Sequence, residues 1–159
     1  MCMEREKKNI VWAIVIMLIS IVVVGGLGAV FVQLGNAWFD GLTKPSEWIP
    51  NWVIPTVWTV IYLTFAIILF LWIKQENLPR KVTILLILNG IFNILWCLVF
   101  FTLKQLLLGN IVLIFNLILA VKLILEIYKT KMLYSSILLI YPVWLCLASS
   151  LNMAVWILN

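Results

Sequence analysis

Histidine is missing from the sequence, and its absence limits the chemistry that the chain can perform. Histidine is the commonest metal ligand, a usual axial ligand of haem iron and the usual general base. The three cysteines, Cys2, Cys97 and Cys146, do not have the spacing of a metal site. We therefore predict no metal site, no resident cofactor and no conventional acid–base catalyst.

Charged residues are also scarce: they make up 11% of the chain, whereas apolar residues make up 65%. A water-soluble domain carries about 25% charged residues, so we expect the lipid bilayer to surround this chain. The cations stand in short clusters rather than in one basic stripe, which argues against a nucleic-acid partner. Nothing resembles a linker, and residues 1–159 are expected to form a single domain.

Five apolar runs are each long enough to cross a membrane, which takes about 20 helical residues. The runs are continuous, whereas the strands of a membrane barrel alternate between polar and apolar residues. The sequence therefore predicts an all-α membrane protein, a bundle of five transmembrane helices. The expected helices cover residues 10–34, 52–73, 82–103, 106–128 and 133–158.

The positive charges outside these runs are unevenly distributed. If five helices alternate in direction, eight cations fall on one side and only Lys44 and Lys104 fall on the other. Cytoplasmic loops carry an excess of Lys and Arg, so we expect the N-terminus inside and the C-terminus outside. The eight cations of the inner side are Arg5, Lys7, Lys8, Lys74, Arg80, Lys81, Lys129 and Lys131.

One long connection, residues 35–51, joins the first two helices and contains Pro45 and Pro50, which rule out a continuous helix. Its aromatic residues fit a belt at the membrane surface, where Trp is enriched. The prolines and the Lys-Pro-Ser turn favour instead a shaped lid over the bundle. Both interpretations stay open here. The aromatic residues of the connection are Trp38, Phe39 and Trp48.

Nine tryptophans are a large excess for this length, and three of them lie deep within the apolar runs. Each shares a helix face with polar or small residues at helical spacing. Polar groups in hydrocarbon seek internal partners, so these faces should point into the bundle. They could line one cavity, or their amides could bond neighbouring helices. The three stripes are Trp58 and Tyr62; Asn89, Asn93, Trp96 and Phe100; and Trp144, Ala148, Asn152 and Trp156.

The segment WFDGLTKPSEWIP, followed by WTVIY, resembles the signature of the tryptophan-rich sensory protein family, also called the translocator protein or peripheral benzodiazepine receptor family. The family pattern is W-[YF]-x-x-L-x-K-P-S-W-x-P-P, with W-x-x-L-Y in the second helix. Here Glu47 displaces Trp48 by one position, and Ile61 replaces the usual Leu. The matching residues are Trp38, Phe39, Leu42, Lys44, Pro45, Ser46 and Pro50.

Two further blocks agree with this family. FNILWCLVFF resembles its third-helix pattern N-x-x-W-x-x-x-F-F, and YPVWLCLASSLN resembles its fifth-helix pattern, with Trp144 one place early. Many members carry an acidic residue in the fourth helix, where this chain has Val112. The matching residues of the two blocks are Asn93, Trp96, Phe100, Phe101, Pro142, Ala148, Ser149, Leu151 and Asn152.

The resemblance implies a five-helix protein of the bacterial cytoplasmic membrane that binds porphyrins such as protoporphyrin IX, or benzodiazepine-type drugs. It implies a receptor acting in tetrapyrrole regulation or stress sensing. Two alternatives stay open: a light- and oxygen-dependent enzyme that degrades porphyrin, with Trp58 and Trp144 as catalytic residues, and a porphyrin or sterol transporter.

The resemblance also implies which residues line the ligand site. Separately, Gly25 and Ala29 form a small-xxx-small pair that would suit either a homodimer or packing within the bundle. The expected ligand-binding residues are Trp38, Phe39, Pro45, Ser46, Trp48, Pro50, Trp58, Tyr62, Asn89, Asn93, Trp96, Phe100, Trp144, Ala148 and Asn152.

Overall fold

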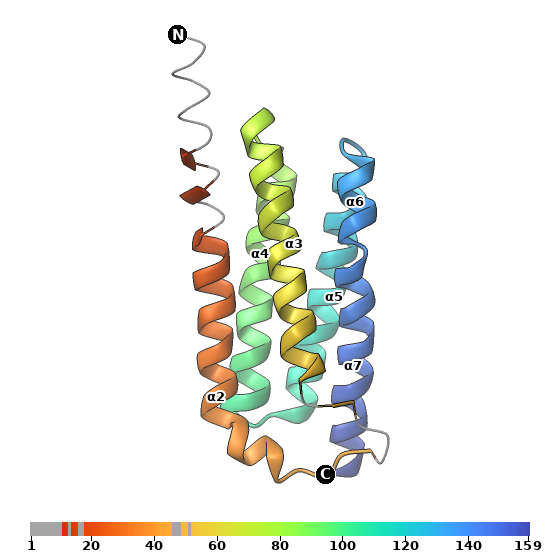
Figure 1. The fold of residues 1–159 in the computed structure, drawn as a ribbon. Coiled ribbons are helices and arrows are strands. Elements are labelled where there is room, and N and C mark those ends of the chain that lie inside the picture. Colours follow the sequence, from red (N-terminus) through yellow and green to blue (C-terminus); the bar gives the residue numbers. More distant parts are fainter. Residues whose placement is uncertain (1–10, 13, 16–17, 46–48, 51) are drawn as a thin grey trace.

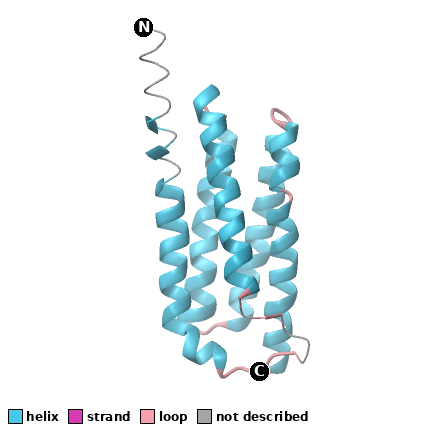
Figure 2. Ribbon diagram, in the orientation of Figure 1, coloured by secondary structure: helices cyan, strands magenta, loops and turns pink. Residues whose placement is uncertain are grey.

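The computed structural model describes residues 11–12, 14–15, 18–45, 49–50 and 52–159. Within this part of the chain the backbone is helical with short connections, and no strand occurs (Figure 1, Figure 2). Five helical segments are long and apolar enough to cross a membrane, which confirms the predicted fold class. The spans are Val22–Asp40, Val53–Gln75, Arg80–Thr102, Leu106–Tyr128 and Met132–Leu158.

Three of the spans consist of two helical elements each. Short π-helical turns begin the first span and end the third. The fifth is interrupted at Leu139, because Pro142 has no N–H to donate to the carbonyl group of Leu138. In chain order the elements are η1 (Ser20–Gly26), α2 (Leu27–Asp40), α3 (Val53–Gln75), α4 (Arg80–Cys97), η2 (Leu98–Thr102), α5 (Leu106–Tyr128), α6 (Met132–Leu138) and α7 (Ile140–Leu158).

The first span ends at Asp40 and not at the predicted residue 34. Neither Asn36 nor Ala37 breaks a helix, and the first proline that would forbid one comes only at Pro45. The predicted start of the lid, residue 35, is therefore wrong, because the connection between the first two spans begins at Gly41. Trp38 and Phe39, which were predicted for the lid, lie on α2, and Trp48 lies outside the described residues.

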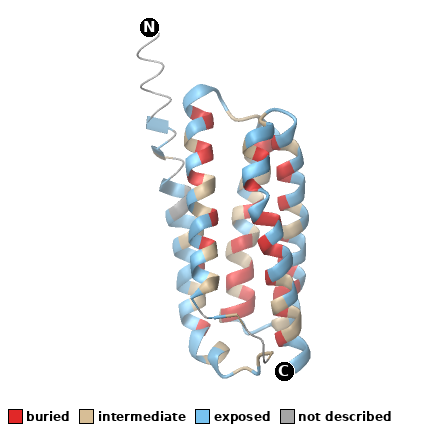
Figure 3. Ribbon diagram, turned by 45° about the vertical axis from the view of Figure 1, so that its right-hand side comes forward, coloured by how far each residue is buried: buried red, intermediate tan, exposed pale blue. Residues whose placement is uncertain are grey.

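Helix α5 is central to the packing and contacts α4, α6, α7 and η2. Buried residues face the interior of the bundle, and exposed ones face outward (Figure 3). Helix α3 packs against η1, α6 and α7. Although α3 and α4 are consecutive and fully described, no Cα atom of one comes within 8 Å of a Cα atom of the other. This separation leaves room for a cavity.

The two ends of the bundle differ in charge. The loop end carries the α2–α3 connection, the α4–α5 connection and Asn159, and the opposite end, here called the basic end, carries the α3–α4 and α5–α6 connections (Figure 1). At the basic end Lys131 forms an ion pair with Glu76 over 2.8 Å, which links the connection before α6 to the end of α3. The cations described at this end are Lys74, Arg80, Lys81, Lys129 and Lys131.

Candidate ligand site

The predicted stripes on α3, α4 and α7 all turn into the bundle. Trp58 is 9% exposed, Asn93 is 4% exposed and Trp144 is 5% exposed. Ala148 and Asn152 are buried beside them, whereas Trp156, at the far end of the α7 stripe, is exposed. The helical spacing of polar and aromatic residues therefore indicated the inward faces correctly for this inner part of the set.

Three tryptophans from three helices form a cluster toward the loop end, here called the indole cluster: Trp58, Trp96 and Trp144. Trp58 stacks on Trp96 with ring centroids 5.9 Å apart, and meets Trp144 edge-on at 6.4 Å. Phe100 of η2 lies beside Trp96 at 6.2 Å, and Phe39 of α2 lies 6.0 Å from Phe100. Such aromatic pairs add about 0.5–1.5 kcal/mol each beyond the area that they bury.

The indole cluster is nearly filled. The hollow between its rings has a volume of about 30 Å³, which is enough for one or two water molecules. Trp58 also stacks on Tyr62, with ring centroids 5.6 Å apart, so that the ring of Tyr62 bounds the cluster on the side of the basic end. The predicted residues are thus brought together, but this arrangement leaves no open space for a large ligand among them.

Three N–H donors around this hollow are buried and have no hydrogen-bond partner in the described part of the chain. They are Nε1 of Trp96, Nε1 of Trp144 and Nδ2 of Asn152. A buried donor without an acceptor costs about 1–3 kcal/mol, so each such group in a native structure requires an explanation. A ligand with carbonyl or carboxylate oxygens would supply the missing acceptors.

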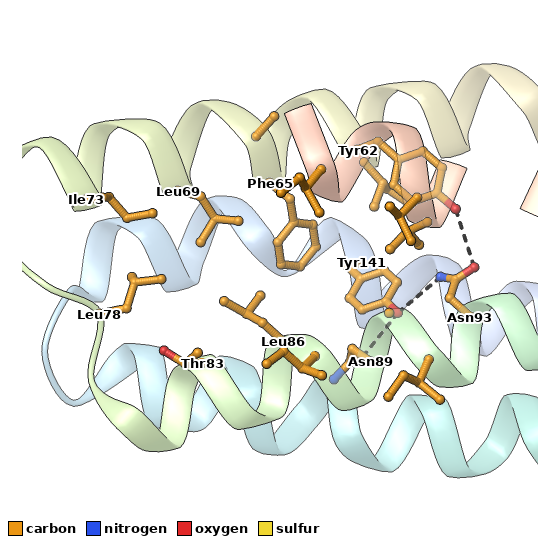
Figure 4. A pocket seen from close by; sticks show the side chains of 18 of the residues that line it. Tyr62, Phe65, Leu69, Ile73, Leu78, Thr83, Leu86, Asn89, Asn93 and Tyr141 are labelled. Carbon is orange, nitrogen blue, oxygen red and sulfur yellow. Dashed lines mark hydrogen bonds between the residues drawn. The ribbon is translucent and has the colours of Figure 1, made fainter. Parts of the chain in front are cut away.

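Nearer the basic end, four polar side chains form a hydrogen-bonded series, here called the polar chain (Figure 4). Its members are Tyr62, Asn93, Tyr141 and Asn89. Tyr62 Oη donates to Asn93 Oδ1 over 3.4 Å, and Asn93 Nδ2 donates to Tyr141 Oη over 3.5 Å. Tyr141 Oη in turn donates to Asn89 Oδ1 over 3.1 Å. Tyr141 was not among the predicted site residues, although it lies one helical turn before Trp144 and therefore on the same face.

The polar chain borders a cavity of about 720 Å³ between η1, α3 and α4. Its volume lies within the usual range of about 300–1,000 Å³ for small-molecule sites. Tyr62, Asn89 and Asn93 line it, whereas Trp58, Trp96 and Trp144 do not. The single hollow expected from the sequence is therefore divided into a filled indole cluster near the loop end and an open cavity nearer the basic end.

The connection at the loop end covers the indole cluster. Ile49 packs against the buried core around the indoles, and Lys44 Nζ lies 4.6 Å from the ring centroid of Phe39. Two hydrogen bonds join the connection to the last residue: Thr43 N donates to Asn159 Oδ1 over 3.0 Å, and Asn159 Nδ2 donates to Thr43 O over 2.9 Å. These contacts hold the described residues of the connection against the loop end of the bundle.

The outer members of the predicted set have less contact with the cluster. Trp38 meets Phe100 edge-on at 6.3 Å, while Pro45 is half-buried and Pro50 is exposed. Ser46 and Trp48 lie outside the described residues. Gly25, predicted for a dimer or for internal packing, has the ring of Tyr62 of the same chain 3.6 Å from the position of its missing Cβ, whereas Ala29 is exposed.

The fourth span contributes apolar packing at the position where related sequences carry an acid. Val112 is buried on α5 and belongs to the same core as the indole cluster. Among the described residues no group of three His, Cys, Asp or Glu side chains could hold a metal ion. The described side chains of the site can therefore stack on aromatic rings and form hydrogen bonds through amide, indole and phenol groups.

Comparison with known proteins agrees with these features. The model of the TspO/MBR family matches residues 7–157. The chain is 30% identical to the tryptophan-rich protein TspO of Archaeoglobus fulgidus over 89% of this chain and 94% of that one. It is 29% identical to protein CrtK of Rhodobacter capsulatus over 85% of both chains. Its identity to the human translocator protein is 28%, over 77% of this chain and 75% of that one.

Proposed function

Because the chain belongs to the TspO/MBR family, we propose that it is a membrane receptor that binds porphyrins, such as protoporphyrin IX, at the indole cluster. The observation that supports this proposal most directly is the set of unpartnered N–H groups of Trp96, Trp144 and Asn152 beside stacked indole rings. Flat apolar faces with a few polar groups are the usual composition of a small-molecule site.

Binding at this site requires the cluster to open, because the present hollow of about 30 Å³ cannot hold a porphyrin. Among the described residues of the lid, Thr43 is joined to Asn159 by two exposed hydrogen bonds, and Lys44 forms a partly exposed ion pair with Asp40 of α2 over 4.0 Å. Each exposed bond contributes about 1 kcal/mol or less. A ligand that places its ring between the indoles would recover the cost.

Each part of the ligand would meet a matching group. The macrocycle would stack on Trp58 and Trp144, and burial of its apolar area contributes about 25 cal/mol per Å². Its carboxylates would lie toward the loop end, where Lys44 and the unpartnered indole N–H groups supply donors. Because the chain has no histidine to ligate iron, metal-free porphyrin should bind at least as tightly as haem.

The test is a titration of the purified protein in lipid nanodiscs with protoporphyrin IX, followed by porphyrin absorbance. The variant Trp144→Phe removes one donor and part of the stacking surface, and we expect its Kd to rise by about 5- to 30-fold, equivalent to about 1–2 kcal/mol. Trp156→Phe is the matched control, since Trp156 lies on the same helix but is 39% exposed. Equal Kd values for the two variants, or no saturable binding, would refute the proposal.

A second candidate function is light- and oxygen-dependent degradation of porphyrin, with Trp58 and Trp144 as the reacting residues. The edge-on contact of their rings favours it, because it would bring two oxidisable indoles to one bound macrocycle. Illumination with and without oxygen distinguishes the two functions. Loss of porphyrin absorbance in air but not under argon supports degradation, whereas unchanged porphyrin under both conditions supports a receptor alone.

A further inference from the structure

The cavity between η1, α3 and α4 is separate from the proposed porphyrin site and has a different composition. Its wall on α4 runs from Thr83 to Ile94, which is about 16 Å at 1.5 Å per residue. Its wall on α3 runs from Ile61 to Ile73, a similar length. The cavity is therefore an elongated slot along the bundle, whereas a porphyrin is a broad disc.

None of the described residues that line the slot is charged. Most are apolar side chains such as Leu69 and Leu86. The polar chain of Tyr62, Asn93, Tyr141 and Asn89 borders one region of the slot, and the uncharged polar residues Asn77 and Thr83 line its basic end. Placing an ionised group in such surroundings without a counter-ion is strongly unfavourable. A carboxylate, an ammonium or a phosphate is thereby disfavoured, and a neutral molecule is favoured.

The polar chain has hydrogen-bonding capacity left for such a molecule. Asn89 Nδ2 donates one hydrogen to Leu85 O over 3.0 Å, and an amide nitrogen carries two. Tyr141 Oη has its own hydrogen directed to Asn89 Oδ1, which can accept a second bond. One hydroxyl group placed at Asn89 would therefore find both a donor and an acceptor.

The slot also opens toward the lipid. Several of its lining residues lie on the outer surface of the bundle: Ile19 is 55% exposed, Ile87 is 58% exposed and Ile91 is 52% exposed. Ile87 and Ile91 belong to the apolar span Arg80–Thr102. A molecule can therefore reach the slot sideways from the hydrocarbon phase, and this route selects for molecules dissolved in the bilayer.

From the shape, the uncharged walls, the polar region and the lateral opening, we propose that this cavity is a second binding site, for a neutral, linear lipid-soluble alcohol. The hydrocarbon chain lies between α3 and α4 in the slot. The hydroxyl group exchanges hydrogen bonds with the amide of Asn89. Occupation of this site is independent of porphyrin binding at the indole cluster.

The probe is a hexadecanol analogue that carries a diazirine group in its chain, photoactivated in nanodiscs with the full-length protein, with labelled residues located by mass spectrometry. We expect labelling concentrated on the facing sides of α3 and α4, and competition by hexadecanol but not by hexadecanoate. Labelling spread evenly over all five spans, or equal competition by both molecules, would overturn the proposal.

Leu86→Trp fills the slot and should reduce this labelling by about ten-fold, while Leu125→Trp, on the lipid-facing side of α5, should leave it unchanged. Leu69→Phe fills the slot from the α3 side and replaces Leu86→Trp if thermal unfolding shows that variant to be misfolded. Asn89→Leu removes both hydrogen bonds to the hydroxyl group, so competition by hexadecanol should weaken several-fold. Hexadecanoate should still fail to compete, because the walls of the slot remain uncharged.

Porphyrin affinity measured in the slot-filling variants keeps the two sites distinguishable. We expect it to be unchanged when alcohol labelling is lost. Loss of both together would show one shared site and contradict the proposed second one. Failure of the wild-type protein to bind porphyrin, with its alcohol labelling intact, would count against the receptor proposal alone.

Discussion

Gly35 marks the closest approach between two spans. A Cβ atom added there would lie 2.1 Å from the carbonyl oxygen of Phe101, which belongs to the backbone and cannot move aside. The neighbouring Thr102 Oγ1 donates to Phe31 O over 3.0 Å and joins the same two helices. Only glycine allows this approach, so the contact between α2 and η2 depends on it.

Gly35→Ala should therefore lower the stability of the bundle by about 2–3 kcal/mol, because α2 must move away from η2. Thermal unfolding in detergent, followed by circular dichroism, measures the change. Gly26→Ala is the matched control: nothing lies within 4 Å of its added Cβ, and helix propensity predicts a stabilisation of up to about 1 kcal/mol. A similar midpoint for the two variants would show that α2 and η2 are not in close contact.

At the level of single residues, the sequence predicts which helix faces point inward better than it predicts the volume left open between their side chains. Trp58, Asn93 and Trp144 could be assigned to the interior because polar and aromatic groups recur with helical periodicity. The filling of the indole cluster could not be predicted, because it depends on ring orientations and helix separations. The motif that contains Tyr141 does not single this residue out; the signal for it is its helical spacing from Trp144, which places both on one face.

At the level of helices, one ion pair fixes the start of α6 to the end of α3. The hydrogen bond from Lys131 and the attraction of its charge lower the pKa of Glu76 below its ordinary value, and the same pair raises the pKa of Lys131. A lowered carboxyl pKa contributes stability that is present above the unfolded value, near pH 4.3, and is lost as the pH falls through the folded value.

Glu76→Gln should therefore lower the unfolding temperature at about pH 7 but not at about pH 3, where the wild-type carboxyl group is protonated as well. The effect should be small because the pair is exposed. Thermal unfolding of both proteins across this range measures it. In a Lys131→Met background the same substitution should have no effect at either pH. A difference between wild type and Glu76→Gln that persists in acid would assign another role to this side chain.

Helix boundaries were predicted well where charge or proline marks them. The fourth span, Leu106–Tyr128, has the predicted bounds, because Lys104 and Gln105 separate two apolar runs and Lys129 follows. The end of the first span was missed, because polar residues near Asn36 suggested a loop although the helix tolerates them. The π-helical turns left no recognisable signal in the sequence.

For the molecule as a whole, the five spans of the described residues place the start of the first span and the end of the last at opposite ends of the bundle (Figure 1). Five described cations gather at the basic end, and Lys44 and Lys104 lie at the loop end. The five are Lys74, Arg80, Lys81, Lys129 and Lys131. Five spans could be counted from composition alone because the hydrocarbon thickness fixes the length of each. The distance between α3 and α4 could not be predicted from the sequence, because no short-range pattern of residues encodes it.

The excess of cations predicts that the basic end faces the cytoplasm. In a variant whose cysteines are replaced by alanine, Thr130→Cys should react with a membrane-impermeant maleimide only after the cells are permeabilised. Thr43→Cys, at the loop end, should react in intact cells. Mass shift on a gel reports both reactions. The reverse pattern would place the lid on the cytoplasmic side and show that the charge bias does not set the orientation.

The close contact at Gly35 holds the first span at the loop end, and Val24 still approaches Gly90 nearer the middle. Beyond that point its described residues Val11, Trp12, Ile14 and Ile19 are largely exposed. These residues precede η1, which still packs against α3 and α4, and we expect the tilt of this first part of the helix to respond to the surrounding lipid. Thinner bilayers favour stronger tilting, so the width of the slot, and with it the affinity for a lipid alcohol, should vary with bilayer thickness.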